Sequence, residues 1–194
     1  MRIFVIDDHP LMREAIGMLI RRLSPTALVV ELERLSAVTS AVSQHGAPEM
    51  ICLDLKLPDS TGVEGIEMLK LKFPDVPLLV LSASPAEEYE TLSIDAGADA
   101  YIEKSAGTTE ITNALNVFLN EEPDADLGTP SGKLSKRQRQ LLILLDKGLS
   151  NRDIAESLDI SEHTVKVHLW RLFRRLNVKS RSQASHLART KGLV

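Results

Sequence analysis

Five polar side chains with chemistry to offer stand at or just beyond the ends of short apolar runs. They are Asp7, Asp8, Asp54, Ser82 and Lys104. Carboxylates that lie within a few ångström of one another disfavour joint ionisation unless a cation lies among them. Mg²⁺ is a hard cation that binds one or two carboxylates and completes its shell with water and phosphate oxygens. The three aspartates therefore indicate a Mg²⁺ site, where Lys104 and Ser82 could contact a phosphoryl group on Asp54.

The elements that must position these side chains follow from an alternation of two periods over residues 1–119. Apolar runs lie at 3–6, 28–32, 50–55, 77–81 and 100–102, and stretches of helical spacing lie at 11–23, 35–44, 66–73, 87–96 and 109–119. The alternation predicts an α/β doubly wound, five-stranded parallel sheet, and uninterrupted apolar runs are typical of strands covered on both faces. Such sheets bind ligands beyond the carboxyl ends of their strands. The predicted sheet thus brings the polar side chains to one edge.

Each polar side chain taken alone has an ordinary structural explanation. Asp8, before His9 and Pro10, could be a helix N-cap, and a lone lysine or serine carries little information. Their joint placement is what favours a phosphoryl site. His9 lies beside the acids, but we expect no metal role for it because Mg²⁺ prefers oxygen. The single cysteine, Cys52, lies in an apolar run and is expected to be a buried small side chain.

The formal net charge of −4 is unevenly distributed along the chain. Residues 1–120 carry 18 acidic and 9 basic side chains, whereas residues 134–194 carry 5 acidic and 13 basic ones. Between them, residues 120–133 contain proline, glycine, serine and acids without an apolar period, which is typical of a linker. The sequence therefore predicts a first domain at 1–119, a linker at 120–133 and a basic domain at 134–194 with the charge expected of a nucleic-acid binder.

The basic domain has the pattern of a helix-turn-helix. A short helix is predicted at about 151–158, a turn at about 159–161, a longer helix at about 162–176 and a last helix at about 181–191. The longer helix has a core stripe of Val165, Leu169, Leu172 and Leu176. Its opposite side carries His163, Lys166, Val167, Trp170 and Arg174. An apolar back and a basic front fit the major groove of DNA.

The segments IFVIDDHP, ICLDLKLPDSTGVEG, LLVLSAS and GADAYIEKS together resemble a CheY-like receiver domain over residues 1–119. The resemblance implies that Asp54 is the phospho-acceptor. It implies that Asp8 and Asp54 ligate Mg²⁺ directly, that Asp7 acts through water, and that the backbone carbonyl of Lys56 completes the protein ligands. Ser82 and Tyr101 would form a switch pair, in which Tyr101 turns inward when Ser82 moves to the phosphate. Without the resemblance, Tyr101 reads as a half-buried strand aromatic.

Residues 134–184 are similar to a LuxR-type helix-turn-helix, most densely in GLSNRDIA, TVKVH and NVKSRSQA. The resemblance implies that Lys166 and Val167 contact base edges. The candidates for phosphate contact are Thr164, Arg171, Arg174, Lys179 and Arg181. Leu187 in the last helix would supply a dimer contact. Trp170 either packs beside Phe173 or contacts thymine methyl groups and sugars.

The two resemblances together imply a NarL/FixJ-type two-component response regulator. Its expected partners are a sensor histidine kinase, double-stranded DNA, a second copy of the chain when active, and RNA polymerase. We expect a cytoplasmic protein with no membrane span, and a receiver that assists only its own phosphorylation and dephosphorylation. Two alternatives stay open: a phosphorylation-independent DNA-binding regulator that uses its receiver to dimerise, and an aspartate-nucleophile phosphohydrolase. The second is disfavoured because Lys56 stands where such enzymes have a second acid.

Overall fold

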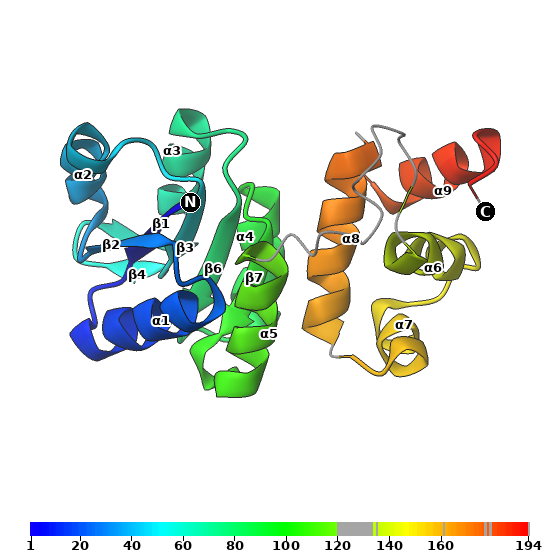
Figure 1. Ribbon diagram of the computed structural model, residues 1–194, viewed down its shortest axis with the longest axis horizontal. Coiled ribbons are helices and arrows are strands. Elements are labelled where there is room, and N and C mark those ends of the chain that lie inside the picture. The colour runs from blue at the N-terminus through cyan, green and yellow to red at the C-terminus, as the bar shows by residue number, and fades with distance from the viewer. Residues whose placement is uncertain (120–133, 135, 161, 177, 179, 194) are drawn as a thin grey trace. The chain divides into compact units, whose positions relative to one another are not determined.

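The chain forms two compact units, Met1–Leu119 and Asn120–Val194, in the computed structural model (Figure 1). The structure describes residues 1–119, 134, 136–160, 162–176, 178 and 180–193. The side chains at positions 136, 137, 163, 167, 170, 171 and 174 lie outside this description, as does the predicted linker. None of the described helices is both long and apolar enough to cross a membrane.

The first unit is built on a five-stranded parallel sheet, as predicted. Its strands are β1 (Arg2–Ile6), β2 (Leu28–Leu32), β3 (Met50–Leu53), β6 (Leu78–Ser82) and β7 (Ala100–Glu103), in the order β2-β1-β3-β6-β7. The chain moves outward from β1 in one direction first and then crosses to the other. The order therefore reverses between β1 and β3, and that crevice is where a doubly wound sheet binds its ligand.

Helices cover both faces of this sheet. They are α1 (Pro10–Leu23), α2 (Val38–His45), α3 (Glu64–Lys72), α4 (Ala86–Asp95) and α5 (Thr108–Leu119). Successive strand residues point to opposite faces, so Phe4 and Ile6 pack in a cluster with Ile66 and Leu69 of α3. α1 and α5 contact one another (Figure 1). Because both faces are covered, four of the five strands are buried or nearly so along their length.

Two local features differ from the prediction. The run predicted as a strand at 50–55 ends at Leu53, and a two-stranded antiparallel hairpin follows, formed by β4 (Lys56–Leu57) and β5 (Ser60–Thr61). The stretch predicted as one helix at 35–44 opens with a 3-10 turn, η1 (Leu35–Ala37). Both differences have one cause: the Asp59 carboxylate in the hairpin accepts hydrogen bonds from the N–H groups of Leu35 and Ser36. The hairpin is thereby joined to the start of η1.

The second unit is helical, with α6 (Lys136–Asp146), α7 (Asn151–Leu158), α8 (Glu162–Leu176) and α9 (Arg181–Thr190). Gly148, in the left-handed region at φ 80°, follows α6 as predicted for a C-terminal glycine. Ser150 and Asp153 form a reciprocal capping box at the start of α7. The predicted stripe on α8 is confirmed at Val165, Leu169 and Leu172, which are buried against Leu141 and Ile154 among others.

Candidate functional site

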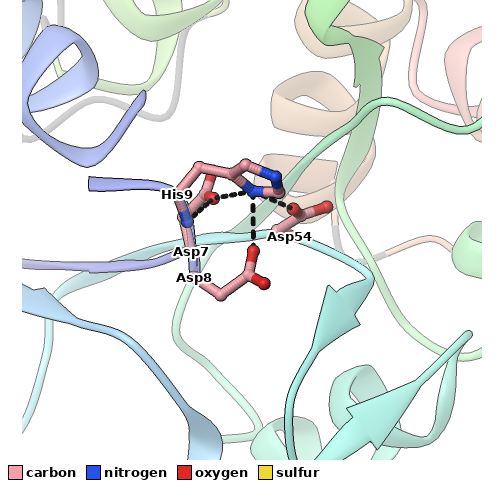
Figure 2. Close-up of side chains that lie close together, drawn as sticks. All are labelled: Asp7, Asp8, His9 and Asp54. Carbon is pink, nitrogen blue, oxygen red and sulfur yellow. Dashed lines mark hydrogen bonds and ion pairs between the residues drawn. The ribbon is translucent and has the colours of Figure 1, made fainter. Parts of the chain in front are cut away.

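The site forms where β1 and β3 end side by side. The backbone N–H of Asp7 donates to the carbonyl of Leu32, and that of Asp54 donates to the carbonyl of Ile6, at 3.0 and 2.8 Å. The sheet ladder therefore continues one residue past each strand, and it holds both aspartates at the strand ends. Figure 2 shows the side chains of Asp7, Asp8, His9 and Asp54 converging there.

Lys104 enters the same pocket from the far side. It begins the 3-10 turn η2 (Lys104–Ala106), which directly follows β7. Its Nζ lies 2.7 Å from Asp7 Oδ2 and 2.6 Å from Asp54 Oδ2, and only 9% of its side chain is exposed. A buried ammonium shared between two buried carboxylates is strongly held by charge. The structure thus brings together the predicted cation and acids from opposite parts of the sequence.

The carboxylate oxygens of the cluster leave room for a further cation. Asp7 Oδ2 and Asp8 Oδ1 are buried, and neither accepts a geometrically sound hydrogen bond within the described part of the chain. Each does lie close to a nitrogen, of Lys104 or His9, but in an orientation that makes no hydrogen bond. Buried oxygens of this kind are costly unless another group satisfies them. An oxygen-rich cluster with unsatisfied lone pairs fits Mg²⁺.

His9 joins the acids, which the sequence prediction did not anticipate. Its Nδ1 lies 2.6 Å from Asp8 Oδ1, 3.2 Å from Asp7 Oδ1 and 4.0 Å from Asp54 Oδ2. The four side chains form a group that could hold a metal ion. The signal that could have found it is adjacency: a residue that directly follows two pocket acids and precedes a proline must begin the next helix at the pocket's rim.

Ser82 and Tyr101, the expected switch pair, lie on neighbouring strands in register with the pocket. Both are buried, and the Tyr101 hydroxyl donates to the backbone carbonyl of Ser84 at 2.7 Å. Burial raises the pKa of the Tyr101 phenol, while a hydrogen bond with the Ser82 side chain opposes that shift. With 2% of Tyr101 exposed, its ring already faces inward, so the inward rotation expected on phosphorylation has no outward starting point here.

Two further residues at this edge act through the backbone. The N–H of Lys56 points to Asp54 Oδ1 at 3.4 Å, while its side chain is exposed. Glu103, at the end of β7, accepts a hydrogen bond from the N–H of Ala86 at 2.6 Å, in the first turn of α4. A carboxylate at a helix N-terminus satisfies a donor that has no partner within the helix. Glu103, which no sequence motif distinguished, thus ties α4 to the strand that carries Tyr101.

The predicted DNA-contacting residues are placed unequally. Lys166 on α8 is half-buried, and Thr164 is 8% exposed, which leaves little surface for a phosphate. Arg181 donates to the carbonyl of Leu149 and to Asn151 Oδ1, so its guanidinium holds the turn before α7. Leu187 on α9 is half-buried. The side chains of Val167, Trp170, Arg171 and Arg174, and all of Lys179, lie outside the described residues.

Two known domain families match the chain in the places the structure divides it. The family described as "Response regulator receiver domain" matches residues 3–116, and "Bacterial regulatory proteins, luxR family" matches residues 132–188. The first match alone spans more than half of the chain.

Proteins of known function match along nearly the whole length. A Pseudomonas putida protein described as a glycerol metabolism activator is 33% identical, covering 94% of this chain and 92% of its own length. The nitrate/nitrite response regulator protein NarL of Escherichia coli is 31% identical with the same coverage. Both therefore share the order of the two domains.

A solved structure supports the fold. RcsB from Salmonella enterica serovar Typhimurium, bound to a promoter in the presence of a phosphomimetic, aligns with a TM-score of 0.55. It is 21% identical and covers 96% of this chain and 97% of its own. The chain therefore belongs to the NarL/FixJ-type response regulators, which join a receiver domain to a LuxR-type DNA-binding domain.

Proposed function

We propose that Asp54 accepts a phosphoryl group from a sensor histidine kinase and that this modification controls dimerisation and promoter binding. The observation that carries the proposal is the pocket itself. Asp54 lies at the reversal point of the sheet, paired with Lys104 and flanked by Asp7 and Asp8. A carboxylate, a fixed cation and an oxygen-rich metal site are the parts that phosphoryl transfer needs.

In the transfer step, an oxygen of the Asp54 carboxylate would attack phosphorus while the bond from phosphorus to the donor's imidazole nitrogen breaks. Asp8, Asp54 and the backbone carbonyl of Lys56 would hold Mg²⁺, with Asp7 acting through water. When bound, the ion supplies positive charge that offsets the negative charge of the phosphoryl oxygens. The residues of the chain position the acceptor, and Lys104 needs little movement to serve the product.

Lys104 and Ser82 would recognise the phosphorylated form. The Lys104 ammonium, now 2.6 Å from Asp54 Oδ2, would pair with a phosphoryl oxygen that replaces part of this contact. Ser82 would donate its hydroxyl to another oxygen. Because Ser82 also contacts Tyr101, and Tyr101 is bonded to the Ser84 carbonyl, a shift of Ser82 would reach the loop before α4. The switch would therefore be a change in this loop around an inward Tyr101.

The second unit would read DNA with α8. Its buried stripe anchors one side of the helix to the unit's core, which is what a helix needs to be presented rigidly to the major groove. Lys166 and Val167 would contact base edges, and Arg171, Arg174 and Lys179 would contact phosphates. Thr164 and Arg181 have the weaker support, given their packing and hydrogen bonds. Leu187 would contribute to a dimer in which two copies of α8 meet two half-sites.

The partners follow from these two activities. A kinase domain and DNA are both met in the cytoplasm, and a DNA-bound regulator would meet RNA polymerase there. The receiver would assist only its own phosphorylation and dephosphorylation. A phosphorylation-independent regulator is the second candidate, but the completeness of the pocket favours the first. A phosphohydrolase has the least support because Lys56, an exposed cation, stands where a second acid would be needed.

The direct test is mass spectrometry of the whole chain after incubation with acetyl phosphate and Mg²⁺. We expect a gain of one phosphoryl group that peptide mapping assigns to Asp54. The variant Asp54→Asn should show no gain, and Asp59→Asn, in the hairpin of the same unit, should behave like the unchanged protein. A gain that persists in Asp54→Asn would overturn the assignment of the acceptor.

A further inference from the structure

His9 is the one member of the pocket whose chemistry the proposed function leaves unused. Figure 2 shows its ring beside the three aspartates, with Nδ1 directed toward their oxygens. The side chain is 66% exposed, so burial does not force the ring into this position. Its Nδ1 nonetheless lies within 4.0 Å of an oxygen from each of the three acids.

The backbone holds His9 at the rim of the pocket. Its N–H donates to Asp7 Oδ1 at 2.9 Å, and its carbonyl accepts from Met12 and Arg13 at the start of α1. His9 is the N-cap of that helix, but its side chain makes no capping hydrogen bond. Pro10 at the first helical position restricts the residue before it to an extended conformation. The imidazole is therefore presented to the acids by a rigid turn and is not used to cap the helix.

The spacing of the four side chains suits a single metal ion. One ligand atom from each of Asp7, Asp8, His9 and Asp54 lies within 4.8 Å of all the others. Nitrogen and oxygen ligands lie about 2.0–2.2 Å from a first-row transition ion, so opposite ligands stand roughly 4 Å apart. The group needs only a small contraction to reach that spacing. A second observation points to the same ion: Asp8 Oδ1, which His9 Nδ1 approaches, is buried and accepts no hydrogen bond within the described residues.

We propose that His9 is a metal ligand and that it makes this pocket prefer a first-row transition-metal ion over Mg²⁺. Imidazole nitrogen is a good ligand for such ions, whereas Mg²⁺ favours oxygen and gains little from it. A site of carboxylates with one imidazole therefore discriminates between the two classes through the nitrogen. The inference concerns the same pocket as the proposed function, but it requires no phosphoryl donor and no transfer step.

The competing explanation is that His9 only hydrogen-bonds to Asp8 and orients it. An outer partner of this kind supports whichever ion the carboxylates hold, so its loss weakens both classes of ion together. A direct ligand gives a different result, because only the ion that binds nitrogen loses a bond. The two explanations are separated by measuring selectivity and by detecting the nitrogen itself.

The test uses Mn²⁺ alone with the full chain, in the absence of any phosphoryl donor. Pulsed electron paramagnetic resonance of bound Mn²⁺ should show the modulation of a directly coordinated ¹⁴N nucleus. That signal should be absent in His9→Ala and present in His45→Ala, which removes an exposed histidine at the end of α2. Calorimetric titration should show that His9→Ala weakens Mn²⁺ binding by roughly 10–100-fold, the range known for loss of a ligand's supporting group. The affinity for Mg²⁺ should stay nearly unchanged.

Three results would overturn the proposal: no nitrogen modulation in the unchanged protein, a modulation that survives in His9→Ala, or equal losses of Mn²⁺ and Mg²⁺ affinity. None of them depends on phosphorylation. If Asp54 failed to gain a phosphoryl group while the nitrogen signal was present, the proposed function alone would be wrong.

Discussion

At the scale of single residues, the pocket is held together by unlike charges that are few and buried. Lys104 is the one described cation whose ammonium forms ion pairs with both Asp7 and Asp54. Removing it leaves carboxylates within a few ångström of one another, a situation that favours protonation, local opening or capture of another cation. The chemistry proposed for the pocket and its stability are therefore two consequences of one arrangement.

Lys104→Met should lower the free energy of unfolding by about 3–5 kcal/mol in metal-free buffer, the usual cost of removing one partner of a buried ion pair. Mg²⁺ should restore more stability to the variant than it adds to the unchanged protein, because the ion replaces a missing charge. Urea unfolding with and without Mg²⁺ measures both effects. Lys147→Met, which removes an exposed lysine after α6, is the control and should change neither value. Equal behaviour of the two variants would show that Lys104 does not bind the cluster.

Cys52 gives a pH-dependent prediction on β3. Burial raises the pKa of its thiol from 9.0 to about 12. The unfolded chain therefore releases the thiol proton first as the pH rises above about 9, and the folded state loses stability between that pH and about 12. The slope approaches about 1.4 kcal/mol per pH unit. Comparing urea unfolding of the unchanged protein and Cys52→Ala from pH 8 to 10.5 isolates this effect, since the variant should lack that part of the slope. Parallel pH profiles would contradict a buried thiol.

Single residues differ in how far the sequence predicts them. Asp7 and Asp54 could be placed because a carboxylate at the end of an apolar run lies at the carboxyl edge of a parallel sheet. His9 could be placed near them by adjacency, but the direction of its ring depends on the turn at Pro10 and on packing. The role of Glu103 depends on α4 beginning beside β7, a tertiary contact that no local pattern contains. The inward position of Tyr101 likewise depends on the Ser84 carbonyl.

At the scale of elements, the helix-turn-helix was the most predictable part. The predicted bounds 151–158 and 162–176 coincide with α7 and α8, because a capping box marks one end and the periodic apolar stripe marks the other. The hairpin of β4 and β5 was missed because its strands have two residues each, too short to show a period. η1 was missed because its start is set by Asp59, which lies 24 residues away from Leu35.

The capping box predicts the stability of the second unit. Ser150→Ala removes the side chain that accepts from the N–H of Asp153, and should cost about 1 kcal/mol of the free energy of unfolding. Ser157→Ala is a matched control in the same helix, where the hydroxyl donates to a helix carbonyl and alanine is the better helix former. Thermal unfolding followed at the helix signal compares them. A Ser150→Ala variant as stable as Ser157→Ala would show that the box does not hold α7.

At the scale of the whole molecule, the two units carry opposite charge. Residues 1–120 have 18 acidic and 9 basic side chains, and residues 134–194 have 5 and 13. An acidic unit tethered to a basic one competes with DNA phosphates for the same lysines and arginines. We therefore expect the unphosphorylated full chain to bind DNA more weakly than residues 134–194 alone.

This difference should be largest at low salt and should shrink as salt is added, because screening weakens attraction between exposed charges. Fluorescence anisotropy with a labelled duplex, over a range of salt concentrations, measures it for both proteins. Equal affinities at low salt would show that the receiver does not mask the DNA-binding unit.

The central claim is that phosphorylation of Asp54 controls binding of DNA, and one measurement tests it most directly. Duplexes selected from random sequence by the phosphorylated full chain are titrated with the unchanged protein and with Asp54→Asn, each before and after incubation with acetyl phosphate and Mg²⁺. We expect a rise in affinity only for the unchanged protein after incubation. An equal rise in both proteins, or none in the unchanged protein once mass spectrometry shows Asp54 to be phosphorylated, would contradict the account.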